Sequence, residues 1–410
     1  MKLNKKCIKY SMVLIPYFEL FTFSMLEERG VAVTLFSFLG ILFSLARTLI
    51  STYYIFSQVF FNGRIRKQHN YLWIAVLVFE LSLIISSSFN KSIYLSYLLG
   101  VYNYIGFATV CSSILYKDEL FFIESGAIVF GILSLMGSFS IFLFPNGFFN
   151  ASSKAGAVYF LGSKNSSFYY YIMFIMFYLY LKIKGLGHKD YKIKFINKKY
   201  DIFLVYLIAF IGSALICRSS NTLICLLIVL VYYIFFFYRY KIQKLMNPYT
   251  IFCFIGIVFY FLLFNSNNKI FEPLLGFFGR TSSYSGRDDI WKQAIEIIKE
   301  HWLVGNGIGL EFYLPSGVYA THAHNWYLDI ITKYGIIPII LFVCYLIYQM
   351  VKLWNNHQYK INSLLVLIMS VFLIHSMFDD ISFYIFIMVF AIVECQEKNK
   401  IVARDKILVY

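Results

Sequence analysis

Long apolar runs separated by short polar segments dominate this chain. A helix needs about 20 apolar residues to cross roughly 30 Å of hydrocarbon. Runs near or above this length lie at residues 10–26, 31–61, 71–88, 93–115, 121–144, 167–183, 202–217, 220–238, 249–264, 326–350, 362–378 and 381–395. The pattern predicts about twelve transmembrane helices. The second run exceeds one crossing, so part of it is expected to tilt or to lie along the membrane surface.

The composition supports this class of protein. Hydrophobic residues make up 60% of the chain and charged residues 14%, whereas soluble domains carry about 25% charged residues. The net charge of +15 does not indicate a nucleic-acid partner, because the basic residues are scattered between apolar runs. The sequence therefore predicts an all-α polytopic membrane protein, in which residues 1–410 form a single membrane-embedded domain.

The distribution of Lys and Arg predicts the orientation in the membrane. If the N-terminus is inside, most of the 36 Lys and Arg residues fall in the inner segments, as the positive-inside rule requires. These segments are 1–9, 62–70, 116–120, 184–201, 239–248, 351–361 and the tail from 396. Both termini are then cytoplasmic. Residues 145–166 form an outer loop, and residues 265–325 form one long extracytoplasmic loop.

The long outer loop contains a predicted amphipathic helix. Ser285 and Asp288 have the spacing of a capping box, and the segment DDIWKQAIEIIKEH follows. Its apolar face carries Ile290, Trp291, Ala294, Ile295 and Ile298. Such a helix lies on the membrane surface or over a cavity, or it packs on the transmembrane bundle. The GNGIG segment after it has no preceding strand, so it predicts flexible backbone near a ligand or a tight turn rather than a dinucleotide site.

Two histidines, His322 and His324, end the long loop. No cysteine lies near them to complete a zinc site, and the pair Asp379-Asp380 is expected to be a solvated turn. A histidine at this boundary is suited to proton transfer near neutral pH, or it is an interfacial histidine with a satisfied hydrogen bond. Both interpretations remain open from residue type alone.

Few arginines lie on the outer side. Arg218 occupies a minimal connection, CRSSN, between two apolar runs. A planar guanidinium binds phosphate through two parallel hydrogen bonds, although an arginine at this depth also reaches the interface by extending its side chain. Arg47, inside the second run, has no partner that the sequence assigns. Placing an arginine at the centre of a transmembrane helix raises the free energy of membrane insertion by about 2.5–3.5 kcal/mol.

Together these features resemble the family of O-antigen ligases and Wzy-type oligosaccharide repeat-unit polymerases. The resemblance rests on Ser285, Gly286, Arg287 and Trp291 in the outer helix, Gly305 and Gly307 in the turn, His324, Asn325 and Gly335 at the loop end, Arg218 between two helices, and Gly156, Gly162 and Asn165 in the earlier outer loop. This chain departs from the pattern where many relatives carry an arginine in the earlier loop, because it offers Lys154 and Lys164. Pro338 also follows Gly335 where small residues are common.

The resemblance implies glycan transfer from an undecaprenyl-diphosphate-linked oligosaccharide at the outer face of the bacterial cytoplasmic membrane. It implies His324 as the catalytic base. The implied substrate-binding residues are Arg218, Arg287, Arg280, Lys164, Asn325 and His322. It implies no cofactor and no metal. A chain-length regulator and a flippase are possible partners, besides membrane lipid.

Three activities fit the pattern to different degrees. A polymerase extends one lipid-linked chain with another, and an O-antigen ligase transfers the glycan to lipid A–core. The enrichment in Lys, Asn, Ile, Phe and Tyr suggests an AT-rich gene, as is common in glycan loci, and favours the polymerase. A polysaccharide flippase or transporter is the alternative from another class, but no internal repeat of the kind found in transporters is visible.

The predicted topology is tested by cysteine labelling of intact cells. A Ser316→Cys variant is expected to react with a membrane-impermeant reagent, because residues 265–325 are predicted to lie outside. Protection of this cysteine until the cells are lysed would contradict the predicted orientation.

Overall fold

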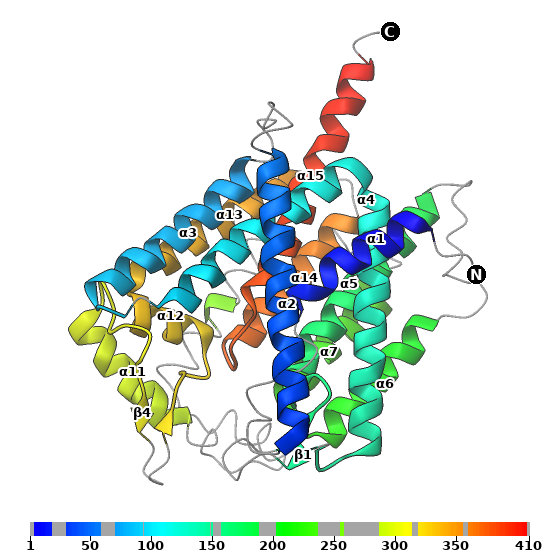
Figure 1. Cartoon of the computed structure of the whole chain (residues 1–410). Helices are drawn as coiled ribbons and strands as arrows, with labels where there is room; N and C mark the ends of the chain where they lie inside the picture. The colour runs from blue at the N-terminus through cyan, green and yellow to red at the C-terminus, as the bar shows by residue number, and fades with distance from the viewer. Residues whose placement is uncertain are drawn as a thin grey trace.

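The computed structural model describes residues 4–18, 30–58, 70–92, 94–147, 149–150, 157–187, 202–236, 255–257, 287–313, 319–355 and 360–407, and all structural statements concern these residues. The described chain is mostly helical (Figure 1). The longer helices are α1 (Lys5–Leu14), α2 (Gly30–Phe56), α3 (Asn70–Phe89), α4 (Leu95–Leu143), α5 (Ser167–Gly187), α6 (Ile202–Ile216), α7 (Ser220–Val231), α11 (Arg287–His301), α12 (Trp326–Tyr334), α13 (Ile336–Asn355), α14 (Lys360–Ser376) and α15 (Phe383–Ile407). Two short helical turns, η1 (Ile15–Tyr17) and η4 (Tyr232–Phe236), follow α1 and α7.

Membrane-spanning helices are present, as predicted. Three described helical segments, Tyr71–Phe89, Leu95–Leu143 and Ile336–Trp354, are long and apolar enough to cross a membrane. Five shorter apolar helices occupy Gly40–Phe56, Phe203–Ile216, Ser220–Phe235, Lys360–Ser376 and Phe383–Gln396. The predicted total of about twelve spans is not confirmed. The run at 249–264 lies outside the described residues, apart from a helical turn at 255–257.

Helix α4 contains two of the predicted spans without an intervening loop. Its 49 residues correspond to about 74 Å of helix, more than twice a hydrocarbon thickness. Asp118 has non-helical angles (φ −145°, ψ 60°) and separates the two arms. Figure 1 shows one arm rising and the other descending from this bend. Lys6 and Tyr10 of α1 bind the Asp118 carboxylate, at 2.8 and 2.6 Å.

The predicted single span at 326–350 was wrong in one respect, because it is broken into α12 and α13. Gly335 between them has φ 80°, a conformation that residues with a Cβ rarely adopt. The GNGIG segment packs across the break. Asn306 N and Gly307 N donate to the carbonyls of Thr332 and Lys333, at 2.8 and 2.9 Å. The tight-turn interpretation of this segment is therefore confirmed.

Short strands depart from the all-α prediction, and they lie in the two predicted outer loops. β1 (Phe149–Asn150), β2 (Ala157–Tyr159) and β3 (Gly162–Ser163) form an antiparallel sheet. β4 (Phe312–Tyr313) pairs with β5 (Tyr319–Ala320). The strands are two or three residues long, so they shape the loops without forming a layer of their own.

The amphipathic helix was predicted within one residue of α11. Ile290, Trp291 and Ala294 are buried against Phe312 and Leu328, and the Trp291 indole donates to Ala323 O at 3.0 Å. Of the two arrangements left open, the structure has the helix packed against the start of α12. Figure 1 shows α11, α12, β4 and β1 at the end of the molecule opposite the C-terminus. The proposed capping residue Ser285 lies outside the described residues.

The break between α12 and α13 is expected to require glycine. A Cβ at Gly335 would overlap the Leu303 carbonyl, whereas a Cβ at Gly309 meets nothing within 4 Å. Gly335→Ala should therefore lower the melting temperature or the membrane level of the protein, because the strained backbone and the steric overlap both act against folding. Gly309→Ala, the matched control, should be close to wild type in the same thermal-unfolding measurement. Equal stability of the two variants would contradict this role of Gly335.

Candidate active site

Four turns that are far apart in the sequence meet at the end of the molecule that holds α11. They are the turn after β3 (163–166), the turn between α6 and α7 (217–219), the loop before α12 (321–325) and the turn between α14 and α15 (377–382). The Asn165 amide donates to the Asp379 carboxylate, and Ser219 Oγ donates to Asn165 Oδ1 at 2.6 Å. These hydrogen bonds join three of the turns directly.

His324 and Asp379 form the titratable pair of this cluster. His324 Nδ1 lies 4.0 Å from Asp379 Oδ1, and the two side chains are 32% and 16% exposed. This separation is too long for a hydrogen bond, and Nδ1 has no hydrogen-bond partner among the described residues. A small side-chain rotation would close the gap. His324 has φ 49°, an uncommon conformation for a residue with a Cβ that often marks a functional position.

The start of α12 fixes the backbone on which His324 lies. Asn325 is the N-cap of α12, and its side chain accepts hydrogen bonds from Tyr327 N and Leu328 N, each at 3.1 Å. Asp329 Oδ1 accepts from Ala323 N at 2.9 Å. Because both side chains are buried, they hold the 323–325 backbone in one conformation. Cap interactions of this kind contribute about 0.5–2 kcal/mol.

The charge of Asp379 is stabilised by its neighbours. Burial by itself raises the pKa of a carboxyl, but His324, His375, Arg287 and the hydrogen bond from Asn165 together hold the pKa of Asp379 below its usual range. The expectation that Asp379 belongs to a solvated turn was therefore wrong. Its place at the outer end of the eleventh predicted span was the available sequence signal, since it put Asp379 on the same side of the membrane as His324.

His322 lies against His324, with ring centroids 4.0 Å apart. Burial, and to a lesser extent the neighbouring His324, lower the pKa of His322 to about 4. His322 is therefore neutral at physiological pH. The histidines and Asp379 also place three potential metal-ligand atoms within 4.8 Å of one another, a grouping that the sequence did not reveal because Asp379 is 55 residues from His324.

The predicted arginines adjoin this cluster in different ways. The Arg287 guanidinium, at the start of α11, donates to Phe378 O at 2.5 Å, one residue before Asp379. Arg218 is exposed in the α6–α7 turn with φ 53°, next to the Ser219 that binds Asn165. Lys164 precedes Asn165, and its carbonyl lies 3.9 Å from the Cys217 sulfur. Arg280 lies outside the described residues.

His375 is close in sequence but serves the core. It is fully buried and stacks on Phe168, with ring centroids 3.7 Å apart and planes within 3°. Its carbonyl accepts from the Asn221 side chain at 3.2 Å. These contacts tie α5, α7 and α14 together beneath the outer turns.

The fold and the site define a membrane protein with a histidine–carboxylate pair and arginines gathered at the end of the molecule that holds α11. Residues 202–343, from α6 into α13, match the family model described as O-antigen ligase (Wzy_C). This match is consistent with the family of O-antigen ligases and Wzy-type polymerases, whose members are glycosyltransferase-like enzymes. The matched segment includes Arg218, Arg287 and His324, so the resemblance drawn from these residues is confirmed. No curated protein matches the chain.

The neutral state of buried His322 has a measurable consequence for stability. A folded-state pKa of about 4 lies below the ordinary value near 6.5, so stability is lost as the pH falls from about 6.5 towards 4. His322→Gln should reduce this loss, and its melting temperature should fall by roughly a few degrees less than that of wild type between pH 6.5 and pH 4.5. Replacing the exposed His301 with Gln is the control and should leave the wild-type slope unchanged. An unaltered slope in His322→Gln would contradict the assigned neutral state.

Proposed function

We propose that this protein polymerises undecaprenyl-diphosphate-linked oligosaccharide repeat units into a surface polysaccharide at the outer face of the cytoplasmic membrane. An acceptor sugar hydroxyl attacks the anomeric carbon of the donor glycan. The new glycosidic bond forms as the bond between that carbon and the diphosphate oxygen breaks. The hydroxyl proton goes to the enzyme, and undecaprenyl diphosphate leaves.

The approach of His324 to Asp379 is the observation that supports this function most directly. A carboxylate that faces Nδ1 favours the tautomer with a proton on Nδ1, which leaves Nε2 free to accept a proton. The same carboxylate stabilises the imidazolium that forms when His324 takes the proton. His324 is therefore proposed as the general base, and Asn325 and Asp329 as the residues that position it. His322, which is neutral and in contact with His324, lies where an acceptor sugar would also be bound.

Arginine side chains are proposed to hold the leaving diphosphate. Arg287 donates a hydrogen bond to the backbone carbonyl of Phe378, next to Asp379. Arg218 precedes Ser219, which begins the Ser219–Asn165–Asp379 chain of hydrogen bonds. A fork of N–H donors at this position would bind phosphate oxygens as negative charge develops on them. Lys164 adds a third positive charge, next to Asn165. Arg280 completes the proposed set from the outer loop.

The acceptor distinguishes a polymerase from an O-antigen ligase, and the composition of the chain favours the polymerase. A second lipid-linked repeat unit is then the acceptor, and both substrates arrive from the membrane. A flippase that delivers the repeat units and a chain-length regulator are the partners that such a reaction implies. If deletion of the gene abolished glycan transfer to lipid A–core and left polymer length unchanged, the result would instead indicate the ligase.

Removing the proposed base is expected to stop polymer synthesis. His324→Ala should lower the rate by about 10²–10⁴-fold, and lipid-linked single repeat units should accumulate. The products are measured by gel analysis of the polymer and by mass spectrometry of extracted lipids. His322→Ala should have a milder effect, and His301→Ala, on the exposed face of α11, should be close to wild type. Normal polymer from His324→Ala at wild-type protein level would reject this base.

Turnover is expected to be independent of metal ions. The Asp379 carboxylate already accepts hydrogen bonds from the Asn165 side chain and from Asp380 N, the latter at 3.0 Å. These hydrogen bonds, together with the nearby Arg287, stabilise the carboxylate charge without an ion. The purified enzyme should therefore retain its activity in excess chelator. Loss of activity that Zn²⁺ restores would instead make His322, His324 and Asp379 a catalytic metal site.

A further inference from the structure

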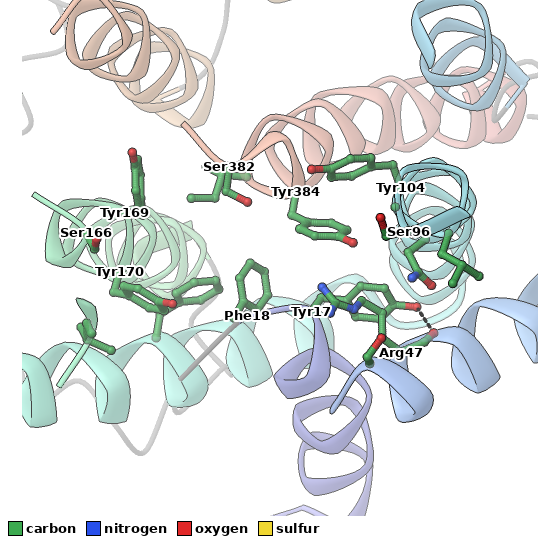
Figure 2. A pocket seen from close by; sticks show the side chains of 17 residues that line it. Tyr17, Phe18, Arg47, Ser96, Tyr104, Ser166, Tyr169, Tyr170, Ser382 and Tyr384 are labelled. Carbon is green, nitrogen blue, oxygen red and sulfur yellow. Dashed lines mark hydrogen bonds between the residues drawn. The ribbon is translucent and has the colours of Figure 1, made fainter. Parts of the chain in front are cut away.

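A cavity of about 460 Å³ lies within the helix bundle, beside the candidate active site. Its walls come from α2, α4, α5, the start of α15 and the end of the first helical segment at Tyr17 and Phe18. Its volume falls within the range of about 300–1,000 Å³ that is usual for small-molecule sites. Figure 2 shows side chains from these separate elements converging on one space.

The cavity reaches the active site through three of its lining residues. Ser166 follows Asn165, whose side chain binds Asp379. Tyr169 donates its hydroxyl hydrogen bond to the Asp380 carbonyl, and Ser382 belongs to the same turn. A molecule in the cavity would therefore have one end next to the turn that carries Asp379.

The chemistry of the walls is mixed in a way that suits a sugar. Five tyrosines, Tyr17, Tyr104, Tyr169, Tyr170 and Tyr384, line the space together with Ser and Asn side chains. Aromatic faces pack against the C–H faces of sugar rings, and hydroxyl and amide groups pair with sugar hydroxyls. A hydroxyl oxygen that already donates its hydrogen, as that of Tyr169 does, still accepts a hydrogen bond from a sugar hydroxyl, whereas an apolar lipid chain makes no use of such groups.

Arg47 is the one charged residue among the described residues that line the cavity. Its guanidinium lies 5.9 Å from the centre of the Tyr384 ring, and Figure 2 shows it beside Tyr17 and Tyr384. An ionisable residue inside a membrane bundle is costly and usually faces a cavity or a substrate pathway. The position of Arg47 in the middle of an apolar run is thus explained by the cavity that it lines.

We propose that this cavity binds an acidic sugar of the lipid-linked oligosaccharide, with Arg47 facing the anionic group and the tyrosines holding the sugar ring. This inference rests on the proposed function, since it identifies the substrate class of the same enzyme. A carboxylate and a phosphate substituent share the chemistry that Arg47 would recognise. The proposal requires that the anion belong to the glycan, because Arg218 and Arg287 are assigned to the diphosphate.

Binding to the purified full-length protein in lipid nanodiscs tests the cavity without turnover. The probes are digalacturonic acid and the neutral disaccharide galactobiose, compared by isothermal titration. The acidic probe should bind about tenfold more tightly, and Arg47→Gln should remove this preference. His324→Ala should keep the preference, so failure of the base and failure of the cavity give different results.

A matched pair of variants tests the same charge without changing Arg47. Ser96 is an exposed residue that lines the cavity. Ser96→Asp adds a negative charge and should abolish the preference for the acidic probe, whereas Ser96→Asn has nearly the same size and should retain it. Equal affinity of the wild type for both probes, or a preference that survives both Arg47→Gln and Ser96→Asp, would overturn the proposal.

The polymer made by the producing strain provides an independent test. Its repeat unit should contain an acidic residue, which sugar analysis assigns to a carboxylate or phosphorus analysis assigns to a phosphate substituent. A repeat unit with neither group would overturn the proposal. So would tighter binding of inorganic pyrophosphate than of the acidic probe in the wild type, with the pyrophosphate binding lost in Arg47→Gln, because the cavity would then bind the carrier's diphosphate rather than the glycan.

Discussion

The Asp379 carboxylate makes the interactions on which the candidate active site of this protein depends. It accepts the hydrogen bond from Asn165 and faces His324 at 4.0 Å, while Asn165 in turn accepts from Ser219. One buried negative charge thereby connects turns from three parts of the chain. Losing one partner of such a network costs more than the net value of one hydrogen bond, because the others remain buried and partly unsatisfied. The network therefore holds the turns that carry Asn165, Ser219 and Asp379 in one arrangement.

Rigid helices supply the rest of this arrangement. Asn325 caps α12, and the GNGIG segment binds the carbonyls at its other end, so the short helix that begins beside His324 is fixed at both termini. Trp291 connects α11 to Ala323, and Arg287 connects it to Phe378. The first contact holds α11 against the segment that leads into α12, and the second joins α11 to the turn between α14 and α15. The proposed base, diphosphate-binding groups and glycan cavity therefore all belong to one framework.

The sequence predicted what depends on local pattern. Apolar runs marked most described helices, the 3.6-residue period of 288–301 marked α11, and residue types singled out His324, Arg218 and Arg287. Contacts between distant segments were not predictable in this way. Asp379 was taken for a solvated turn because no local signal records its approach to Asn165. The break at Gly335 was missed because apolar composition continues across it, whereas the bend at Asp118 falls in the charged segment 116–120 that the sequence placed between two spans. The cavity around Arg47 likewise depends on five separate segments.

The central claim is that His324 and Asp379 act as one catalytic unit, and a double-mutant cycle on polymerisation rates measures this directly. Rates are compared for His324→Gln, Asp379→Asn and the double variant, at equal amounts of folded protein. If Asp379 acts through His324, the double variant should be no slower than His324→Gln alone, because effects of residues that act as a unit do not add. Rate losses that multiply in the double variant, or a His324→Gln enzyme that retains the wild-type rate, would contradict the account.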